Sequence, residues 1–327
     1  MTKKKKVTLQ DIAKRTGFSI ATISHYINKT RKIEESTQDT ILAAINDLGY
    51  PLPATRNYTT GSLTIGIIIS DIRVDYFSEI IRAAEDYAYD KSINIIFMDS
   101  EENPKKEKMC IKTMIKLGVA GIILAPSDTK ANFNYCNSFP IIQIDRMVDN
   151  TSFDFVGIDN LTSTYIITKK LINEKHNKIG FITFPQDNYC ARERARGYKL
   201  SMIENNIYDE NLFLEIPYDA TSTEHNITHW LRNHEEITSI ICTSTNICCE
   251  TLDSMEYLKN KTNITKICTF DNNKWLDHLS VPIDSIVQPT ASIASTAIEM
   301  LILQISNNTQ QREAKKIFLN SEIIERK

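Results

Sequence analysis

The feature that most restricts the fold is a pair of short helical patterns joined by a glycine, within residues 7–28. Thr8 and Asp11 stand at capping-box spacing, where a hydroxyl and a carboxylate satisfy the free amide groups at a helix start. Gly17 ends the first pattern, because glycine tolerates the backbone angles of a tight turn, and Ser19 can cap a second helix. Two short helices around such a turn are typical of a helix-turn-helix, whose second helix enters the major groove of DNA.

One face of the second helix is expected to pack in the core, and its other faces are left for DNA. Ile23, Tyr26 and Ile27 form its apolar stripe. Ile20 and Ala21 can touch thymine methyl groups but cannot donate hydrogen bonds, so we expect His25 to carry most of the polar readout. The predicted DNA-binding residues of this region are Thr8, Ile20, Ala21, Thr22, Ser24, His25, Asn28 and Lys29.

The net charge of −3 hides a division along the chain. Residues 1–62 contain ten basic and five acidic residues, whereas the remainder contains 28 and 36. Positive charge is therefore concentrated around the helix-turn-helix, as phosphate binding requires. A run of lysines at 3–6 is the densest part, and it is also consistent with a solvated terminus.

The same residues resemble the headpiece of the lactose-repressor (LacI/GalR) family of bacterial transcription regulators. The matching motifs are T-L-Q-D-I-A, S-I-A-T-I-S-H-Y-I-N-K-T-R and a later L-G-Y before a proline. A third helix is expected over 34–48, with Ile41, Leu42, Ile45 and Leu48 at core spacing. Gln38 departs from the family, which usually has a basic residue for a phosphate contact at this position.

Residues 51–62 have the composition of a linker. The resemblance implies a hinge that becomes helical on operator DNA and inserts a leucine into the minor groove, as apolar wedges do. Here Tyr58 stands at the leucine position and Arg56 precedes it, and both are predicted DNA contacts. The linker is also shorter than is usual in the family.

From residue 63 onward, apolar strand patterns alternate with helical patterns, as in a doubly wound α/β fold. The motifs DYFSEI, IDR, VGIDN, RERARGY, TFDN, DSIVQP and SEIIERK extend the family resemblance over residues 7–327. We therefore expect an all-α headpiece at 1–50, a hinge at 51–62 and a two-lobed periplasmic-binding-protein-like core of parallel sheets at 63–327. The resemblance implies a first lobe of about 63–160 and 289–316, and a second of about 161–288 and 317–327.

A cleft between two such lobes is the expected effector site, because ligands bind beyond the carboxyl ends of parallel strands. Arginine and carboxylate groups can grip adjacent sugar hydroxyls, and aromatic rings can face the ring carbons. The resemblance implies that Arg194 and Asp271 contact the effector. The other predicted effector-binding residues are Tyr76, Phe77, Asp145, Arg146 and Ser244.

Each effector residue also has a structural alternative. Asp145 and Arg146 can be an ion pair that supports the cleft wall, and Asp271 can cap the turn that follows it. Ser244-Thr245 stands where the family usually has Asn-Asp, and Asn188 stands where the purine-binding branch has an arginine. These departures argue against a purine effector, and a sugar or sugar phosphate remains.

Other classes of function find little support. His225 and His229 have a spacing that can hold zinc. Apart from His234, no further ligand is evident at a metal-like spacing, and a solvated helix face is the alternative. Phosphate-binding glycine motifs are absent, so we expect no enzyme and no cofactor. A transporter's solute-binding protein would suit the body of the chain, but not the headpiece or the lack of a secretory signal.

The sequence therefore predicts a cytoplasmic repressor of a carbohydrate-use operon. We expect it to bind palindromic double-stranded operator DNA as a homodimer, because one headpiece reads one half-site. An effector is expected to shift the two lobes and so change the affinity for DNA. The seven scattered cysteines are typical of reduced thiols, and no run is long enough to span a membrane.

Overall fold

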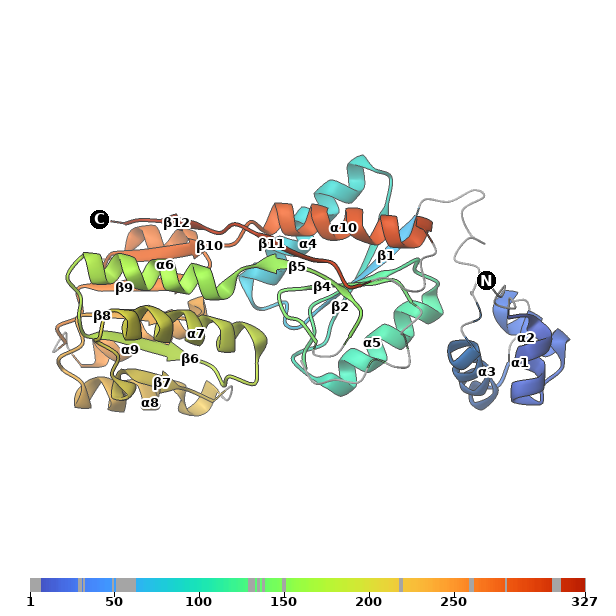
Figure 1. Cartoon of the computed structure of the whole chain (residues 1–327), viewed down its shortest axis with the longest axis horizontal. Coiled ribbons are helices and arrows are strands. Elements are labelled where there is room, and N and C mark those ends of the chain that lie inside the picture. Colours follow the sequence, from blue (N-terminus) through green and yellow to red (C-terminus); the bar gives the residue numbers. More distant parts are fainter. Residues whose placement is uncertain are drawn as a thin grey trace.

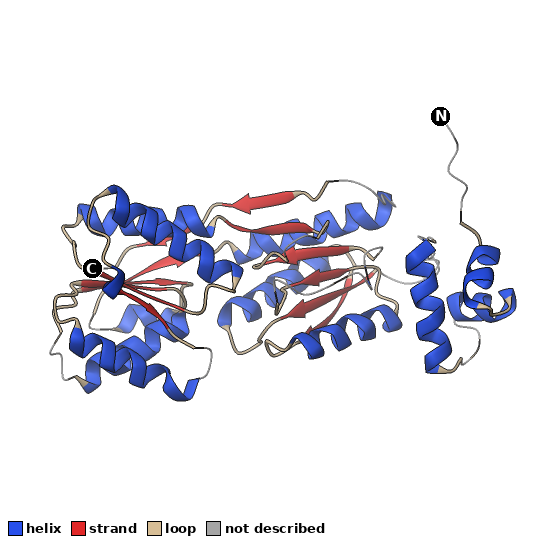
Figure 2. Ribbon diagram, turned by 60° about the horizontal axis from the view of Figure 1, so that its bottom comes forward, coloured by secondary structure: helices blue, strands red, loops and turns tan. Residues whose placement is uncertain are grey.

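The computed structural model describes residues 7–28, 31, 33–48, 50, 63–128, 133, 136, 139–148, 151–217, 220–258, 262–279, 281–307 and 313–326. Within these residues, a helical headpiece is followed by two α/β lobes (Figure 1). The predicted fold class is confirmed, since helices cover the faces of two largely parallel sheets (Figure 2). The predicted hinge at 51–62 lies outside the described residues. No described helix is long and apolar enough to cross a bilayer.

The headpiece consists of α1 (Leu9–Thr16), α2 (Ile20–Asn28) and α3 (Glu35–Leu48). Its core contains Ile12, Ile23, Ile41, Ala44 and Ile45. The predicted third helix is confirmed to within one residue. Leu42 is half-buried and lies outside this cluster, whereas Ala44 is buried in it.

The first lobe is a six-stranded sheet in the order β11-β5-β4-β3-β1-β2. Helix α10 packs beside α4 on one side of this sheet (Figure 1). The elements are β1 (Thr64–Ile69), α4 (Asp75–Asp90), β2 (Asn94–Asp99), α5 (Pro104–Leu117), β3 (Ile122–Leu124), β4 (Ile141–Ile144), β5 (Asp154–Ile158), α10 (Thr290–Asn307) and β11 (Lys316–Leu319).

The second lobe repeats this plan in the order β12-β10-β9-β8-β6-β7, with β12 antiparallel to β10. The elements are α6 (Asn160–Asn173), β6 (Ile179–Thr183), α7 (Tyr189–Glu204), β7 (Phe213–Glu215), α8 (Ala220–Asn233), β8 (Ser239–Cys242), α9 (Thr245–Tyr257), β9 (Lys266–Phe270), β10 (Ile283–Val287) and β12 (Glu322–Ile324), with short 3-10 helices at Glu210–Leu212 and Lys274–His278. Gly197 allows α7 to lie against α6, since a Cβ there would collide with the carbonyl oxygen of Leu161.

The chain passes between the lobes after β5, after β10 and after β11. The first two crossings lie close to the expected boundaries at 160 and 288. The third corrects the prediction, because β11 pairs with β5 of the first lobe through Leu319. Residues 317–319 therefore belong to the first lobe, and the chain enters the second lobe just before β12.

Strands β5 and β10 lack the uninterrupted apolar pattern of a buried strand, because each carries a buried aspartate. The Asp154 carboxylate accepts a hydrogen bond from the backbone amide of Lys315 at 2.8 Å. The Asp284 carboxylate accepts one from the amide of Arg326 at 2.9 Å, and Lys170 and Lys266 lie within 2.8 Å of it. A buried charge is tolerated only with such partners. Because Lys315 and Arg326 lie near the end of the chain, their hydrogen bonds attach that end to both lobes.

Candidate functional site

The turn between α1 and α2 is built by local hydrogen bonds. The backbone amide of Thr8 donates to Asp11 Oδ2 at 2.8 Å, which completes the expected capping box. Gly17 has a φ of 76°, and its amide donates to the carbonyl oxygen of Ala13. Ser19 Oγ accepts from the amide of Thr22 at 3.0 Å and so caps α2. These contacts set the angle at which α2 leaves the turn.

One face of α2 packs on the headpiece core and another is left to solvent. Ile23 is fully buried, whereas Ile20 is 44% exposed. Ala21 is also exposed beside it. An isoleucine in water at the start of a helix, next to a small residue, is a surface that can approach the methyl groups of the major groove.

The other predicted DNA-binding residues fall into four groups. Thr22, Ser24 and His25 are half-buried on α2, and Thr8 is exposed at the start of α1. Asn28 is the last residue of α2, and Lys29, Arg56 and Tyr58 lie outside the described residues. Gln38 Nε2 donates to the carbonyl oxygen of Ile33, so this departure from the family supports the start of α3.

The cleft site lies where elements of both lobes meet. Its cavity of about 130 Å³ is lined by Asp75, Tyr76 and Glu79 of α4, by Asp271, Asn272 and Asn273 after β9, and by Val287, Gln288 and Thr290 at the crossing into α10. The loop after β9 follows the carboxyl end of a parallel strand, as expected for a ligand site in such a sheet.

Asp145 and Asp271 occupy equivalent places in the two sheets. Each directly follows the strand that stands third in the spatial order of its sheet. That strand is β4 in the first lobe and β9 in the second. Their φ angles are 61° and 67°, a left-handed conformation that aspartate adopts more readily than most residues. Burial raises the pKa of both carboxyl groups, that of Asp271 to about 6. Gln288 Nε2 donates to Asp271 Oδ1 at 2.8 Å, so the side chain of Asp271 is held by Gln288.

Arg194 is buried at the base of the same region. Its Nε donates to Asn160 Oδ1 at 2.7 Å, and its Nη1 donates to the carbonyl oxygen of Thr243 at 2.6 Å. The guanidinium also lies 3.6 Å from the centroid of the Phe270 ring. Its positive charge partly offsets the effect of burial on the pKa of Asp271. Arg194 therefore ties together the ends of β8 and β9 and the start of α6.

Arg146 is committed to carboxylates of its own lobe. Its Nη1 and Nη2 each donate to Glu102 at 2.7 Å. Its Nε lies 3.2 Å from Asp145 Oδ2, without the geometry of a hydrogen bond. Asp145 also contacts the second lobe, because Cys190 Sγ donates a hydrogen bond to its carbonyl oxygen at 3.2 Å. The structure thus shows the ion pair that was the alternative interpretation of these two residues.

Tyr76 and Phe77 have different positions. Both are nearly buried and their rings meet edge to face, with centroids 5.1 Å apart. Tyr76 lines the cavity, and its buried hydroxyl has no hydrogen-bond partner among the described residues. Phe77 belongs to the core of the lobe and does not line the cavity.

Two further cleft-side residues cap helices. Ser244 Oγ accepts from the amide of Ile247 at 3.3 Å at the start of α9. Asn188 Oδ1 accepts from the amide of Cys190 at 2.8 Å and so caps α7 at its start.

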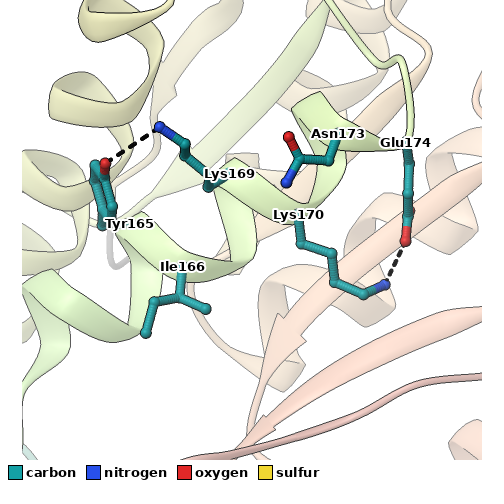
Figure 3. A pocket seen from close by; sticks show the side chains of 6 residues that line it. All are labelled: Tyr165, Ile166, Lys169, Lys170, Asn173 and Glu174. Carbon is teal, nitrogen blue, oxygen red and sulfur yellow. Dashed lines mark hydrogen bonds and ion pairs between the residues drawn. The ribbon is translucent and has the colours of Figure 1, made fainter.

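A larger hollow, of about 480 Å³, lies outside the cleft. Figure 3 shows that its lining side chains come from α6 and its C-cap: Tyr165, Ile166, Lys169, Lys170, Asn173 and Glu174. Lys170 is engaged with Glu174 and Asp284. Because one helix provides the whole lining, this hollow is a surface depression, and the smaller cavity is the better ligand site.

Two family models match the chain. One, described as periplasmic binding proteins and sugar binding domain of the LacI family, matches residues 62–314. The other, bacterial regulatory proteins of the lacI family, matches residues 8–51. The chain belongs to the LacI family. As a LacI-family protein it is a DNA-binding transcriptional repressor with a sugar-binding domain, and its relatives are regulators rather than enzymes.

Individual relatives of this LacI-family chain match along its whole length. The HTH-type transcriptional repressor PurR of Photobacterium profundum is 25% identical over 328 residues, 98% of each chain. The lac repressor dimer bound to operator and the anti-inducer ONPF has a TM-score of 0.70 at 18% identity, over 98% of each chain. The CelR-cellobiose complex has a TM-score of 0.71 at 18% identity, over 98% of this chain and 99% of that one. At such identities the structures show a shared fold.

Several residues of this LacI-family cleft were not predicted from the sequence. They are Asp75, Glu79, Asn160, Cys190, Asn273 and Gln288. Asp75 and Glu79 flank the predicted aromatic pair in the sequence, and Asn273 is two residues from Asp271, so proximity to predicted residues was an available signal. Asn160 and Cys190 had no comparable signal, because tertiary packing alone brings them to Arg194 and Asp145.

Proposed function

We propose that this repressor binds a palindromic operator as a homodimer and that a small sugar-like effector in the interlobe cleft controls this binding. The observation that carries the proposal is the unpartnered, buried hydroxyl of Tyr76 in a cavity whose walls come from both lobes. A buried hydroxyl without a partner is costly, and a bound ligand would satisfy it.

The DNA contacts proposed for the headpiece centre on α2. Ile20 and Ala21 would meet thymine methyl groups, and His25 would read a base edge. Thr8, Thr22, Ser24, Asn28 and Lys29 would hold the phosphates, and Arg56 and Tyr58 would act from the hinge at 51–62. The basic balance of residues 1–62 supports this division of the chain.

The homodimer is supported by apolar side chains left in water on the first lobe. Phe97 on the edge strand β2 is 51% exposed. Met109 and Leu117 on α5 are also more than half exposed. Exposed large apolar groups on neighbouring elements mark interaction sites. A second copy pairing here would bring two headpieces to the two half-sites of an operator.

A carbohydrate effector is supported by the chemistry of the cleft. Tyr76 and Asp271 would contact the ligand directly. Phe77, Asp145, Arg146, Arg194 and Ser244 would hold the walls through the contacts described above. The CelR structure contains cellobiose, which makes carbohydrate use the proposed theme of the regulated operon. Asn188 is occupied as a helix cap, so a purine effector is not proposed.

Ligand entry would require the lobes to separate. A cavity of about 130 Å³ is smaller than typical ligand sites, which measure about 300–1,000 Å³. Three chain crossings connect the lobes. An opening of the cleft would turn the lobes about these crossings. That movement would alter the spacing of two hinges in a dimer and thereby the affinity for operator DNA. Because a repressor acts on the DNA of the cell, we expect this protein to work in the cytoplasm.

The test combines DNA retention with a ligand screen on the full chain. Operator fragments selected from random DNA should be retained with a steep dependence on salt, as phosphate contacts require. A thermal-shift screen of sugars should find a compound that raises the melting temperature, because binding to the folded state alone stabilises it. The same compound should change operator affinity. Salt-insensitive DNA retention, or a ligand without effect on DNA, would contradict the proposal.

A further inference from the structure

The cleft cavity combines an unpartnered hydrogen-bonding group with a concentration of negative charge. Tyr76 is 4% exposed, and its hydroxyl has no partner among the described residues. The lining set adds three carboxyl groups, from Asp75, Glu79 and Asp271. Among the described residues that line the cavity, none is a lysine, arginine or histidine.

Among the described residues, no cation forms an ion pair with the lining side chains of Asp75 and Glu79. Asp75 and Glu79 lie four residues apart on α4, a spacing at which like charges repel. Burial raises the pKa of Glu79, and the charge of Asp75 raises it further. Their described partners are neutral: Asn273 donates to Asp75 at 2.7 Å, and Thr290 donates to Glu79 at 3.5 Å.

The two arginines of the region do not provide an anion receptor. Arg194 gives its Nε and Nη1 to Asn160 and Thr243, and its face lies over Phe270. Arg146 gives both terminal nitrogens to Glu102. Neither residue lines the cavity. A phosphate placed here would face three carboxyl groups without a bidentate arginine, the group that normally recognises it.

We propose that the effector is a hydroxyl-bearing amine, such as an amino sugar, whose ammonium group pairs with Asp75 and Glu79 while its hydroxyls bond to Asp271 and Tyr76. This rests on the proposed effector function of the cleft and narrows its ligand class. An ammonium donates three hydrogen bonds and accepts none, which suits a pocket rich in acceptors. The negatively charged lining would attract such a ligand and repel a sugar phosphate.

Calorimetry on the full chain with matched ligand sets tests the ligand class. Each set contains a parent hexose (D-glucose, D-galactose or D-mannose), its 2-amino-2-deoxy form and its 6-phosphate, at neutral pH. We expect at least one amino sugar to bind tenfold or more tightly than its parent, and the matching phosphate to bind more weakly than the parent. Tightest binding by a phosphate, equal binding by parent and amine, or binding by no amine overturns the proposal.

A charge variant tests the residues. Glu79→Gln should reduce the preference for the amine over its parent at least fivefold. Glu85→Gln, an exposed glutamate on the same helix that does not line the cavity, should leave that preference intact. An unchanged preference in Glu79→Gln overturns the assignment. If a neutral sugar or a phosphate binds and alters DNA retention, the repressor function stands and only the amine proposal fails.

Discussion

The side-chain amide of Asn273, in the second lobe, donates a 2.7 Å hydrogen bond to the carboxylate of Asp75 at the start of α4 in the first lobe. The thiol of Cys190 donates to the carbonyl oxygen of Asp145 across the same divide. Asp75 and Asn273 also line the cavity. Closure of the lobes and contact with a ligand therefore depend on the same side chains.

Asn273→Ala should favour separated lobes. It removes a hydrogen bond to a charged acceptor, which is worth about 1 kcal/mol at a partly exposed site. Small-angle scattering should show a larger radius of gyration for the unliganded variant, and operator affinity should change in the direction that effector produces. Asn173→Ala on the outer face of α6 is the control and should change neither. A variant identical to the wild type in both measurements would show that this contact does not hold the cleft.

Asp271→Asn should weaken ligand binding and stabilise the protein at neutral pH. Burial raises the pKa of Asp271 to about 6, so its ionised form carries an unfavourable burial cost above that pH. Asparagine keeps an oxygen for Gln288 and tolerates the positive φ. We expect a rise in melting temperature, corresponding to about 1–2 kcal/mol, with at least a tenfold loss of effector affinity. Normal ligand affinity with lower stability would indicate that the aspartate only supports its turn.

Glu107→Gln should remove a pH dependence of stability. Burial raises the pKa of Glu107 to about 7, although the amide of Ser127 donates to its carboxylate. Because the folded protein binds this proton more tightly than the unfolded chain, the contribution to stability is present at low pH and is lost as pH rises through about 7.

The variant should therefore exceed the wild type in stability at pH 8 by about 2–3 kcal/mol, and match it near pH 4. Denaturant unfolding at several pH values measures the difference. Glu256→Gln, at an exposed position on α9, should give parallel curves with the wild type. Parallel curves for Glu107→Gln would mean that this carboxyl does not titrate abnormally.

His25→Ala should relax the choice of operator while leaving effector binding intact. The loss of one base contact typically costs about 1–3 kcal/mol and removes discrimination at that base pair. Gel-shift titrations against single-base operator variants measure this, with Thr40→Ala on the exposed side of α3 as a matched control. If His25→Ala keeps the full ranking of operator variants, another residue reads the base.

Removal of residues 1–62 should leave a dimeric core that still binds effector, because the two lobes bury their apolar side chains in clusters that contain no headpiece residue. Light scattering at micromolar concentration measures the assembly. Phe97→Lys should convert this core to a monomer with an unchanged melting profile at low concentration, whereas Tyr257→Lys on the exposed face of α9 should leave the dimer intact. A dimer that survives Phe97→Lys would place the interface elsewhere.

Much of the fold follows from local information. Thr8, Asp11, Gly17 and Ser19 act on residues within four positions of themselves, so the two headpiece helices were predictable from spacing alone. Apolar runs such as that of β1 are long enough to identify buried strands. Strands β5 and β10 are harder to predict, because Asp154 and Asp284 interrupt the apolar pattern and receive hydrogen bonds from backbone amides more than 40 residues away.

The cleft residues also divide into those that local sequence predicts and those that only tertiary packing brings together. Asp271 was predictable, because a carboxylate directly after an apolar strand must reach the carboxyl edge of a sheet. The contacts of Asn160 with Arg194, of Cys190 with Asp145 and of Asn273 with Asp75 span 34 to 198 positions in the sequence. Periodicity and capping report only on neighbours along the chain. The sequence by itself thus determined the helix-turn-helix and the alternation of strands and helices, whereas only the packing of two lobes through three crossings decided which polar groups meet in the cleft.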